Sequence, residues 1–171
     1  MIDDEEQLPP GITPEMLAHF RNLISMDKEC NWFYDGRPIL HAKTLKVLNE
    51  SMSRNDEGKL IVTIGNAWSY VHCEDAPYGV RAVRDVVEGG ALVGLDLILT
   101  DQSTERLDPA TLAVGEGNVL YCRVKNGKEE ARFFRPAYYQ LTQHLDEKDG
   151  EIVLRLGANS SPFGKREKPV Q

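Results

Sequence analysis

The sequence feature that most constrains the fold is an internal repeat. Residues 45–66 (LKVLNESMSRNDEGKLIVTIGN) resemble residues 138–159 (YYQLTQHLDEKDGEIVLRLGAN) in the spacing of their apolar residues and glycines. In both segments, apolar positions at helical spacing precede a polar turn with glycine and then an alternating strand pattern. The repeat predicts a duplicated helix-strand core and therefore an α+β fold with antiparallel sheets.

The two copies match at both their helical and their strand positions. The matched pairs are Leu45 and Tyr138, Leu48 and Leu141, Met52 and Leu145, Gly58 and Gly150, Leu60 and Ile152, Val62 and Leu154, Ile64 and Leu156, and Gly65 and Gly157. Each copy also follows aromatic residues and an Arg-Pro pair, at positions 37–38 and 135–136. The local physics common to any helix, turn and strand would give a similar match without duplication. If the duplication is real, two related halves meet at an interface, where ligand sites preferentially lie.

Other signals place the remaining helices and strands. Helices are predicted at 14–28, 39–53 and 136–145, the first because Thr13 and Pro14 are typical of a helix start. The predicted strands cover residues 31–34, 60–64, 67–74, 79–88, 91–100, 104–107, 119–125, 128–134 and 152–156. The 91–100 strand is apolar on both faces, so we expect it to be central in its sheet.

An Asn-Gly pair at positions 126–127 is the strongest hairpin signal in the chain. A two-residue turn fixes the register, which pairs Cys122 with Ala131 on one face and Arg123 with Glu130 on the other. The pairing is self-consistent because apolar residues meet on one face and opposite charges meet on the other.

We place the boundary between the two halves near Tyr78. This gives an N-terminal α+β half at 1–78, which includes an acidic arm at 1–11, and a C-terminal half at 79–164. The tail at 165–171 is polar and is expected to be frayed, together with the residues just before it that follow Phe163.

Charge and composition exclude several classes of protein. The net charge of −7 argues against binding to a nucleic-acid backbone, which depends on clustered Lys and Arg. The most apolar run, 91–99, is broken by Asp96 and is shorter than the roughly 20 residues of a membrane span. The acidic start lacks the pattern of a signal peptide, and the three cysteines lie far apart. We therefore expect a soluble cytoplasmic protein with free thiols.

The run His72-Cys73-Glu74-Asp75 gathers residue types that bind metals or catalyse reactions. Because side chains alternate along a strand, only two of them share each face, too few for a structural zinc site. A plainer role for Glu74 and Asp75 is to accept backbone N–H groups at the turn before Pro77. A hydrolase or metal-assisted enzyme using His72 and Glu74 remains an alternative.

Aromatic residues and arginines offer a different kind of site. Trp32, Tyr34, Trp68 and Tyr70 either stack on a ligand ring or fill the core. The two arginines of the Arg-Pro pairs, at 37 and 135, either clamp an anion or form ion pairs with an acid such as Asp35 or Asp75.

Four motifs, in order, resemble the bacterial domain-of-unknown-function family 1285. They are WFYDGRP at 32–38, EDAPY at 74–78, RPAYY at 135–139 and SPFG at 161–164, and the resemblance covers about residues 31–164. This resemblance implies an α+β fold with a duplicated core, whose second half superficially resembles a pleckstrin-homology domain. It also implies a nucleotide-like ligand between the halves and a role in signal transduction. The family has no established activity, so the cofactor is unknown.

The sequence thus favours a non-enzymatic, ligand-binding module of signal transduction. Its predicted ligand-binding residues are Trp32, Tyr34, Asp35, Arg37, Glu74, Asp75, Pro77, Tyr78, Arg135 and Tyr139. The predicted partner is a small nucleotide-like molecule, with no nucleic acid and no membrane; a homodimer is left open. A protein-interaction adaptor is the third reading, and it predicts an exposed apolar patch or sheet edge.

Overall fold

The protein forms two compact units in a computed structural model that describes residue 11 and residues 13–167. The first unit runs up to Glu74 and the second begins at Asp75. The boundary therefore lies inside the acidic turn, four residues before the predicted position at Tyr78. The predicted arm at 1–11 lies outside the described residues except for Gly11, and so does the tail from 168.

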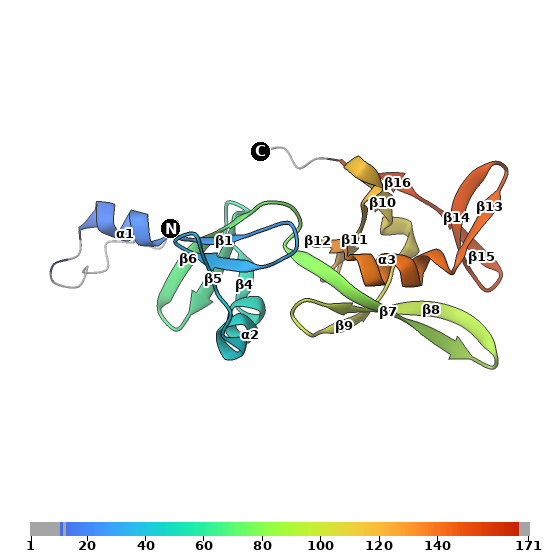
Figure 1. Cartoon of the computed structure of the whole chain (residues 1–171), viewed down its shortest axis with the longest axis horizontal. Helices are drawn as coiled ribbons and strands as arrows, with labels where there is room; N and C mark the ends of the chain where they lie inside the picture. Colours follow the sequence, from blue (N-terminus) through green and yellow to red (C-terminus); the bar gives the residue numbers. More distant parts are fainter. Residues whose placement is uncertain (1–10, 12, 168–171) are drawn as a thin grey trace. The chain divides into compact units, whose positions relative to one another are not determined.

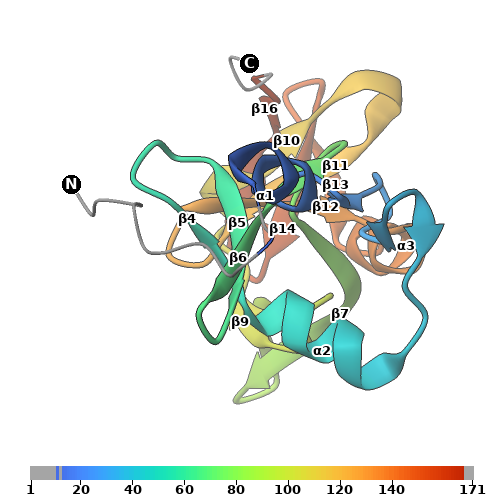
Figure 2. The same ribbon diagram turned by 90° about the vertical axis from the view of Figure 1, so that its left-hand side faces the viewer.

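The first unit is a six-stranded sheet with two helices (Figures 1 and 2). Its elements are α1 (Pro14–Phe20), β1 (Ile24–Met26), β2 (Trp32–Tyr34), β3 (Arg37–Pro38), α2 (Ala42–Glu50), β4 (Met52–Arg54), β5 (Leu60–Ile64) and β6 (Ala67–Cys73). The strand order is β3-β2-β1-β6-β5-β4, and β1 pairs with β6 in parallel. Leu48 of α2 and Trp32 of β2 are buried in the core of this unit.

The second unit contains a seven-stranded sheet, a three-stranded sheet and one α-helix (Figure 1). Its elements are β7 (Tyr78–Glu88), β8 (Ala91–Leu99), β9 (Thr104–Arg106), β10 (Ala113–Val114), β11 (Leu120–Val124), β12 (Glu129–Phe133), α3 (Arg135–Thr142), β13 (Leu145–Lys148), β14 (Glu151–Leu156), β15 (Asn159–Pro162) and β16 (Gly164–Lys165), with 3-10 turns at Pro109–Thr111 and Glu116–Asn118. The sheet orders are β16-β10-β11-β12-β7-β8-β9 and β13-β14-β15, and α3 packs against β7. The predicted α+β class is confirmed.

The repeat corresponds to two similar local structures. In the first unit the order is α2-β4-β5-β6, and in the second it is α3-β13-β14-β15. The strand register also matches, because Met52 pairs with Val62 and Leu145 pairs with Leu154. The matched turn glycines at 58 and 150 have φ angles of 78° and 81°, a conformation that favours glycine. Both copies thus place a three-stranded antiparallel meander after a helix.

The predicted hairpin and the first helix start are confirmed. Strands β11 and β12 pair in the expected register, with Cys122 opposite Ala131 and Arg123 opposite Glu130. The Thr13 side chain accepts a hydrogen bond from the backbone N–H of Met16 at 3.2 Å. Both features depend on neighbours in sequence, which is why the local pattern was sufficient to predict them.

All three helices are shorter than predicted, and for the same reason. The last apolar residue of each predicted stripe, Ile24, Met52 and Leu145, lies in strand β1, β4 and β13 respectively. An apolar residue seven positions on continues a helical stripe, but it equally suits the buried face of a new strand. Pairing with another strand makes these residues part of a strand and not of the helix. Ile24, for example, pairs with Val71 of β6.

Two further predictions about the second unit were wrong. Strand β8 lies next to the short edge strand β9 and not at the centre of the sheet. The segment after Phe163 is not frayed at its start, since β16 pairs with β10 and Arg166 forms ion pairs. In the part of the chain that the structure describes, no helix is long and apolar enough to cross a membrane.

Candidate functional site

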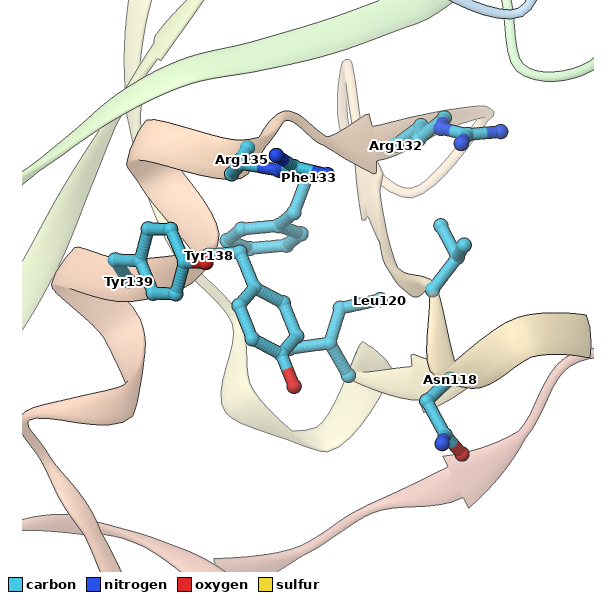
Figure 3. Close-up of a pocket in the computed structure, with 8 residues that line it drawn as sticks. Asn118, Leu120, Arg132, Phe133, Arg135, Tyr138 and Tyr139 are labelled. Carbon is cyan, nitrogen blue, oxygen red and sulfur yellow. The ribbon is translucent and has the colours of Figure 1, made fainter.

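The candidate site is a cavity of about 240 Å³ in the second unit (Figure 3). It lies among the turn before β11, the end of β12 and the first turns of α3. Its lining residues are Asn118, Val119, Leu120, Arg132, Phe133, Arg135, Tyr138 and Tyr139. The lining combines aromatic rings, an aliphatic floor, an amide and two arginines, which is the usual composition of a small-molecule site.

Helix α3 supplies the aromatic wall of the cavity. Its inner side is fixed by Ala137 and Leu141, both fully buried. With those positions directed to the core, Tyr138 is half-buried and Tyr139 is 60% exposed. The two tyrosine rings lie edge to face with centroids 6.0 Å apart. The burial of one side of α3 therefore leaves both tyrosines toward the cavity, where they can contact a planar ring.

Arg135, the first residue of α3, is the uncommitted cation of the site. Its side chain is exposed, and among the described residues it forms no ion pair or side-chain hydrogen bond. The sequence alternative paired this arginine with an acid such as Asp75, but other arginines bind that carboxylate. The Arg135 guanidinium thus keeps its planar set of N–H donors for an anion.

Arg132 also lines the cavity, but its charge is neutralised. Its Nη1 atom donates to Oδ2 of Asp75 at 2.8 Å, and the Tyr121 hydroxyl donates to the same oxygen at 2.7 Å. Arg166 contacts Oδ1 of Asp75 at 2.7 Å and also forms a bidentate pair with Glu130. In Figure 3 the Arg132 guanidinium points away from the aromatic residues. Arg132 therefore contributes its aliphatic stem, and not a free charge, to the lining of the cavity.

Protonation equilibria in this cluster follow from its contacts. Burial would raise the pKa of Asp75, but hydrogen bonds from Tyr121 and Arg132 and the charge of Arg166 outweigh it, so that pKa is lowered. Burial and the neighbouring carboxylate raise the pKa of Tyr121 to about 12. Asp75 is therefore a charged structural anchor at neutral pH.

In the acidic turn, Glu74 accepts a backbone N–H group, as the plainer role predicted, whereas the contacts of Asp75 described above are with side chains. The Glu74 carboxylate accepts a hydrogen bond from the backbone N–H of Lys28 at 3.1 Å. The Pro77 and Tyr78 side chains are buried. All the predicted site residues around this turn are therefore buried or bonded within their own unit.

The predicted site residues of the first unit are divided between its core and one hairpin. Trp32 is only 1% exposed, and its Nε1 donates to the Asn49 side chain at 3.0 Å, so its ring is not accessible for stacking. Tyr34 and Arg37 pair across β2 and β3, with Asp35 in the turn between them. These three residues are brought together at an exposed hairpin.

The residues of the enzyme alternative are not among the described residues that line the cavity. The His72 ring nitrogen Nε2 is 3.0 Å from the Asn22 side-chain oxygen, and Glu74 is bound to the Lys28 backbone. Within residues 13–167 no three His, Cys, Asp or Glu side chains are placed to hold a metal ion. The structure thus adds no support for a site at His72 and Glu74.

Of the residues predicted from the sequence to bind a ligand, Arg135 and Tyr139 line the cavity, but most of their neighbours there were not predicted. Asn118, Leu120, Phe133 and Tyr138 were not predicted to line a site. One signal was present for Tyr138, because the repeat places it where the first copy has Leu45. No local pattern indicated Asn118, which reaches the cavity through the packing of distant segments.

Comparisons with known proteins give the fold. No protein-family model matches the chain. No curated protein matches it either. A solved DUF1285 family protein from Silicibacter pomeroyi DSS-3 is similar with a TM-score of 0.67 and 18% identity, over 92% of this chain and 90% of that one. A second, from Shewanella baltica OS155, has a TM-score of 0.55 and 18% identity, over 71% of this chain and 91% of that one. The resemblance to this family is thus confirmed at the level of the fold.

Proposed function

We propose that this protein, which has a DUF1285-like fold, is a non-enzymatic module that binds a small nucleotide-like ligand in the cavity of its second unit. The observation that carries the proposal is the uncommitted Arg135 guanidinium beside the aromatic wall of α3. A cation next to two aromatic rings is complementary to a ligand that carries both a planar ring and an anionic group.

The chemistry of the lining favours binding over catalysis. Among the described residues that line the cavity there is no Asp, Glu, His, Cys or Ser, which are common general bases and nucleophiles. Tyr138 and Tyr139 offer faces and edges for a ring, the buried Phe133 adds apolar surface, and the Asn118 amide offers one donor and one acceptor type for the edge of a base. In this role the protein transmits the presence of the ligand, as the family resemblance implies for signal transduction.

The size of the cavity limits the ligand. A volume of about 240 Å³ is below the lower end of common ligand sites, which is roughly 300 Å³. A ligand of the usual size would therefore remain partly in solvent. The exposed position of Tyr139 at the rim agrees with a partly exposed ligand.

The test is a ligand-observed NMR titration of the full chain with adenosine, adenosine 5′-monophosphate and adenosine 3′,5′-cyclic monophosphate. Arg135→Ala is expected to weaken nucleotide binding about tenfold or more, because a hydrogen bond to a charged group contributes roughly 1.5–3 kcal/mol. The matched control is Arg84→Ala, which removes an exposed arginine of β7 that does not line the cavity. Equal losses in both variants, or no binding of any nucleotide at millimolar concentration, would contradict the proposal.

A further inference from the structure

The two arginines of the cavity differ in the charge they offer to a ligand. Arg132 is held by Asp75, whereas Arg135 has no ion pair among the described residues. The side chain of Arg132 is 21% exposed and that of Asp75 is 12% exposed, so their interaction is shielded from solvent. A ligand that recruited Arg132 would leave the Asp75 carboxylate with one partner fewer in a poorly solvated place, which is unfavourable.

The cluster behind Arg132 is balanced as a whole. Its charged members are two arginines, Arg132 and Arg166, and two carboxylates, Asp75 and Glu130, which gives a net charge of zero. Arg166 contacts both carboxylates and also lies over the Tyr121 ring, with its guanidinium carbon 3.8 Å from the ring centroid. The cluster is therefore saturated internally, and it has no surplus positive charge for the cavity.

The remaining lining adds no charge of either sign. Asn118, Val119, Leu120, Phe133, Tyr138 and Tyr139 are neutral. The described residues of the cavity thus offer a single net positive charge, that of Arg135. One guanidinium binds two oxygens of a phosphate or carboxylate with parallel hydrogen bonds, and it neutralises one negative charge.

We propose that the ligand of this cavity is a planar-ring monoanion, and that the site discriminates against the corresponding dianion. This inference rests on the proposed function and adds to it the charge of the ligand class. A cyclic phosphodiester and an aromatic carboxylate both carry one negative charge at neutral pH. A phosphate monoester, whose second pKa is about 6, is mainly a dianion there. Its second charge would lie in the cavity without a counter-ion.

A matched pair of probes isolates the charge. Adenosine 3′,5′-cyclic monophosphate and adenosine 5′-monophosphate share the base, the ribose and one phosphate, and at pH 8 they differ by one negative charge. We expect the cyclic nucleotide to bind about tenfold more tightly, since an uncompensated charge in a partly desolvated site is unfavourable. Benzoate is the third probe, and it distinguishes a carboxylate from a phosphodiester as the source of the monoanion.

A pH series on the unmodified protein separates charge from shape. Lowering the pH from 8 to 5.5 converts most of the 5′-monophosphate to its monoanion, because its second pKa is about 6. Its affinity is then expected to approach that of the cyclic nucleotide, whose charge and affinity stay constant. None of the cavity-lining side chains is a histidine or a carboxylate, and the Asp75 and Glu130 carboxylates behind Arg132 are ion-paired.

The Asp75→Asn variant supplies the converse test. Asparagine keeps the shape of the side chain but removes the charge that neutralises Arg132, so the cluster next to the cavity gains a net positive charge. The preference for the cyclic nucleotide is then expected to fall or reverse, and native methyl dispersion in the NMR spectrum checks that the variant is folded. If it does not fold, the pH series still decides.

Each outcome has one meaning. Equal or tighter binding of the 5′-monophosphate at pH 8 would overturn this inference and leave the proposed binding function standing. Tighter binding of the cyclic nucleotide that narrows at low pH supports the inference. Binding of benzoate but of no nucleotide supports the monoanion and removes the nucleotide from the proposed function. If none of the probes binds, both proposals fail.

Discussion

The two copies of the repeat, each a helix followed by a three-stranded meander, have similar backbones but different surroundings. In the first copy, α2 covers a core that contains Trp32, and its Asn49 accepts the hydrogen bond of the indole. In the second copy, α3 packs against β7 and presents two adjacent tyrosines to the cavity. At the two matched tyrosine positions the first copy has a leucine and a lysine, at 45 and 46.

The difference separates residues that define the unit from residues that define the site. Leu48 and Leu141 occupy the same position of the repeat and are 4% and 0% exposed. The positions where the copies diverge include Tyr138 and Tyr139, which line the cavity. On the proposed function, the ligand contacts therefore come from positions where one copy departs from the other, and not from what the copies have in common. Five predictions test how far the equivalence of the copies extends.

The largest effect is expected at the common leucine. Leu48→Ala and Leu141→Ala should each reduce the free energy of unfolding of their unit by about 2 to 5 kcal/mol, since each removes a buried side chain and leaves a cavity. Urea unfolding of the first unit can be followed by tryptophan fluorescence, because both tryptophans, Trp32 and Trp68, belong to it. Amide NMR signals of β11 and β12 report on the second unit. If either substitution costs less than about 1 kcal/mol, the leucines are not equivalent anchors.

The second prediction concerns the ion-pair cluster around Arg166, which belongs to the second unit. Arg166→Ala should destabilise this unit by about 2 to 3 kcal/mol, because it leaves Asp75 and Glu130 without a shared partner in a poorly solvated place. The control Arg155→Ala breaks an exposed pair with Asp146, and it should cost less than about 1 kcal/mol. Similar losses in both variants would mean that the cluster is not a special anchor.

The same cluster predicts a pH dependence with a definite sign. The pKa of Asp75 is lower in the folded protein, so its contribution is present above the unfolded pKa of about 3.9 and is lost as the pH falls through the folded value. The pKa of Tyr121 is raised to about 12, so its contribution is complete below the unfolded pKa of about 10 and is lost as the pH rises toward 12. Unfolding of the second unit measured across pH should show both losses. A flatter acid limb is expected for Arg166→Ala.

The fourth prediction uses the residue that follows each common leucine. Asn49→Ala leaves the Trp32 N–H buried without a partner and should cost about 1 to 3 kcal/mol. The equivalent Thr142 donates to the Tyr139 carbonyl at an exposed position, and Thr142→Ala should stay within about 0.5 kcal/mol. Asn49→Asp retains an acceptor oxygen and serves as the matched control. A large loss for this variant would show that the position is sensitive to charge and not to the hydrogen bond.

Local signals predicted much of this fold, because many of its strands and hairpins are determined by residues that are neighbours in the sequence. The Asn-Gly turn fixed the β11–β12 register, and the repeat gave the order of the meanders. The helix ends were missed at Ile24, Met52 and Leu145, where one apolar residue suits both a helix and a strand and only long-range pairing decides.

The candidate site was predicted only in part, because only some of its residues are neighbours in the sequence. Arg135 and Tyr139 stand together in one motif on α3, so the sequence could identify both. Asp75 is separated from Arg132 and Arg166 by 57 and 91 positions, and their meeting depends on the packing of β12 and β16. The sequence treated Asp75 as a ligand-binding candidate, whereas the structure commits it to two arginines and a tyrosine. Long-range ion pairs of this kind leave no local pattern in the chain.

The smallest effect is expected at the second glycine of each copy, where the backbone is equivalent and the neighbours are not. Gly65 and Gly157 have φ angles of 61° and 60°, so alanine at either position should cost about 1 kcal/mol in backbone strain. A Cβ atom at Gly65 would meet nothing within 4 Å, whereas at Gly157 it would lie 3.0 Å from the Leu92 carbonyl oxygen. We expect Gly157→Ala to be the more destabilising of the two.

Asparagine at the same two positions separates the causes of that difference. Asparagine tolerates the left-handed conformation better than alanine but carries the same Cβ atom. Gly65→Asn should therefore recover most of the stability that Gly65→Ala loses, while Gly157→Asn should retain the loss due to the contact with Leu92. Urea unfolding of the four variants measures the loss in each alanine variant and the recovery in each asparagine variant. Equal recovery at the two positions would show that the β8 backbone yields to the added atom, and that the copies are equivalent in packing here as well as in conformation.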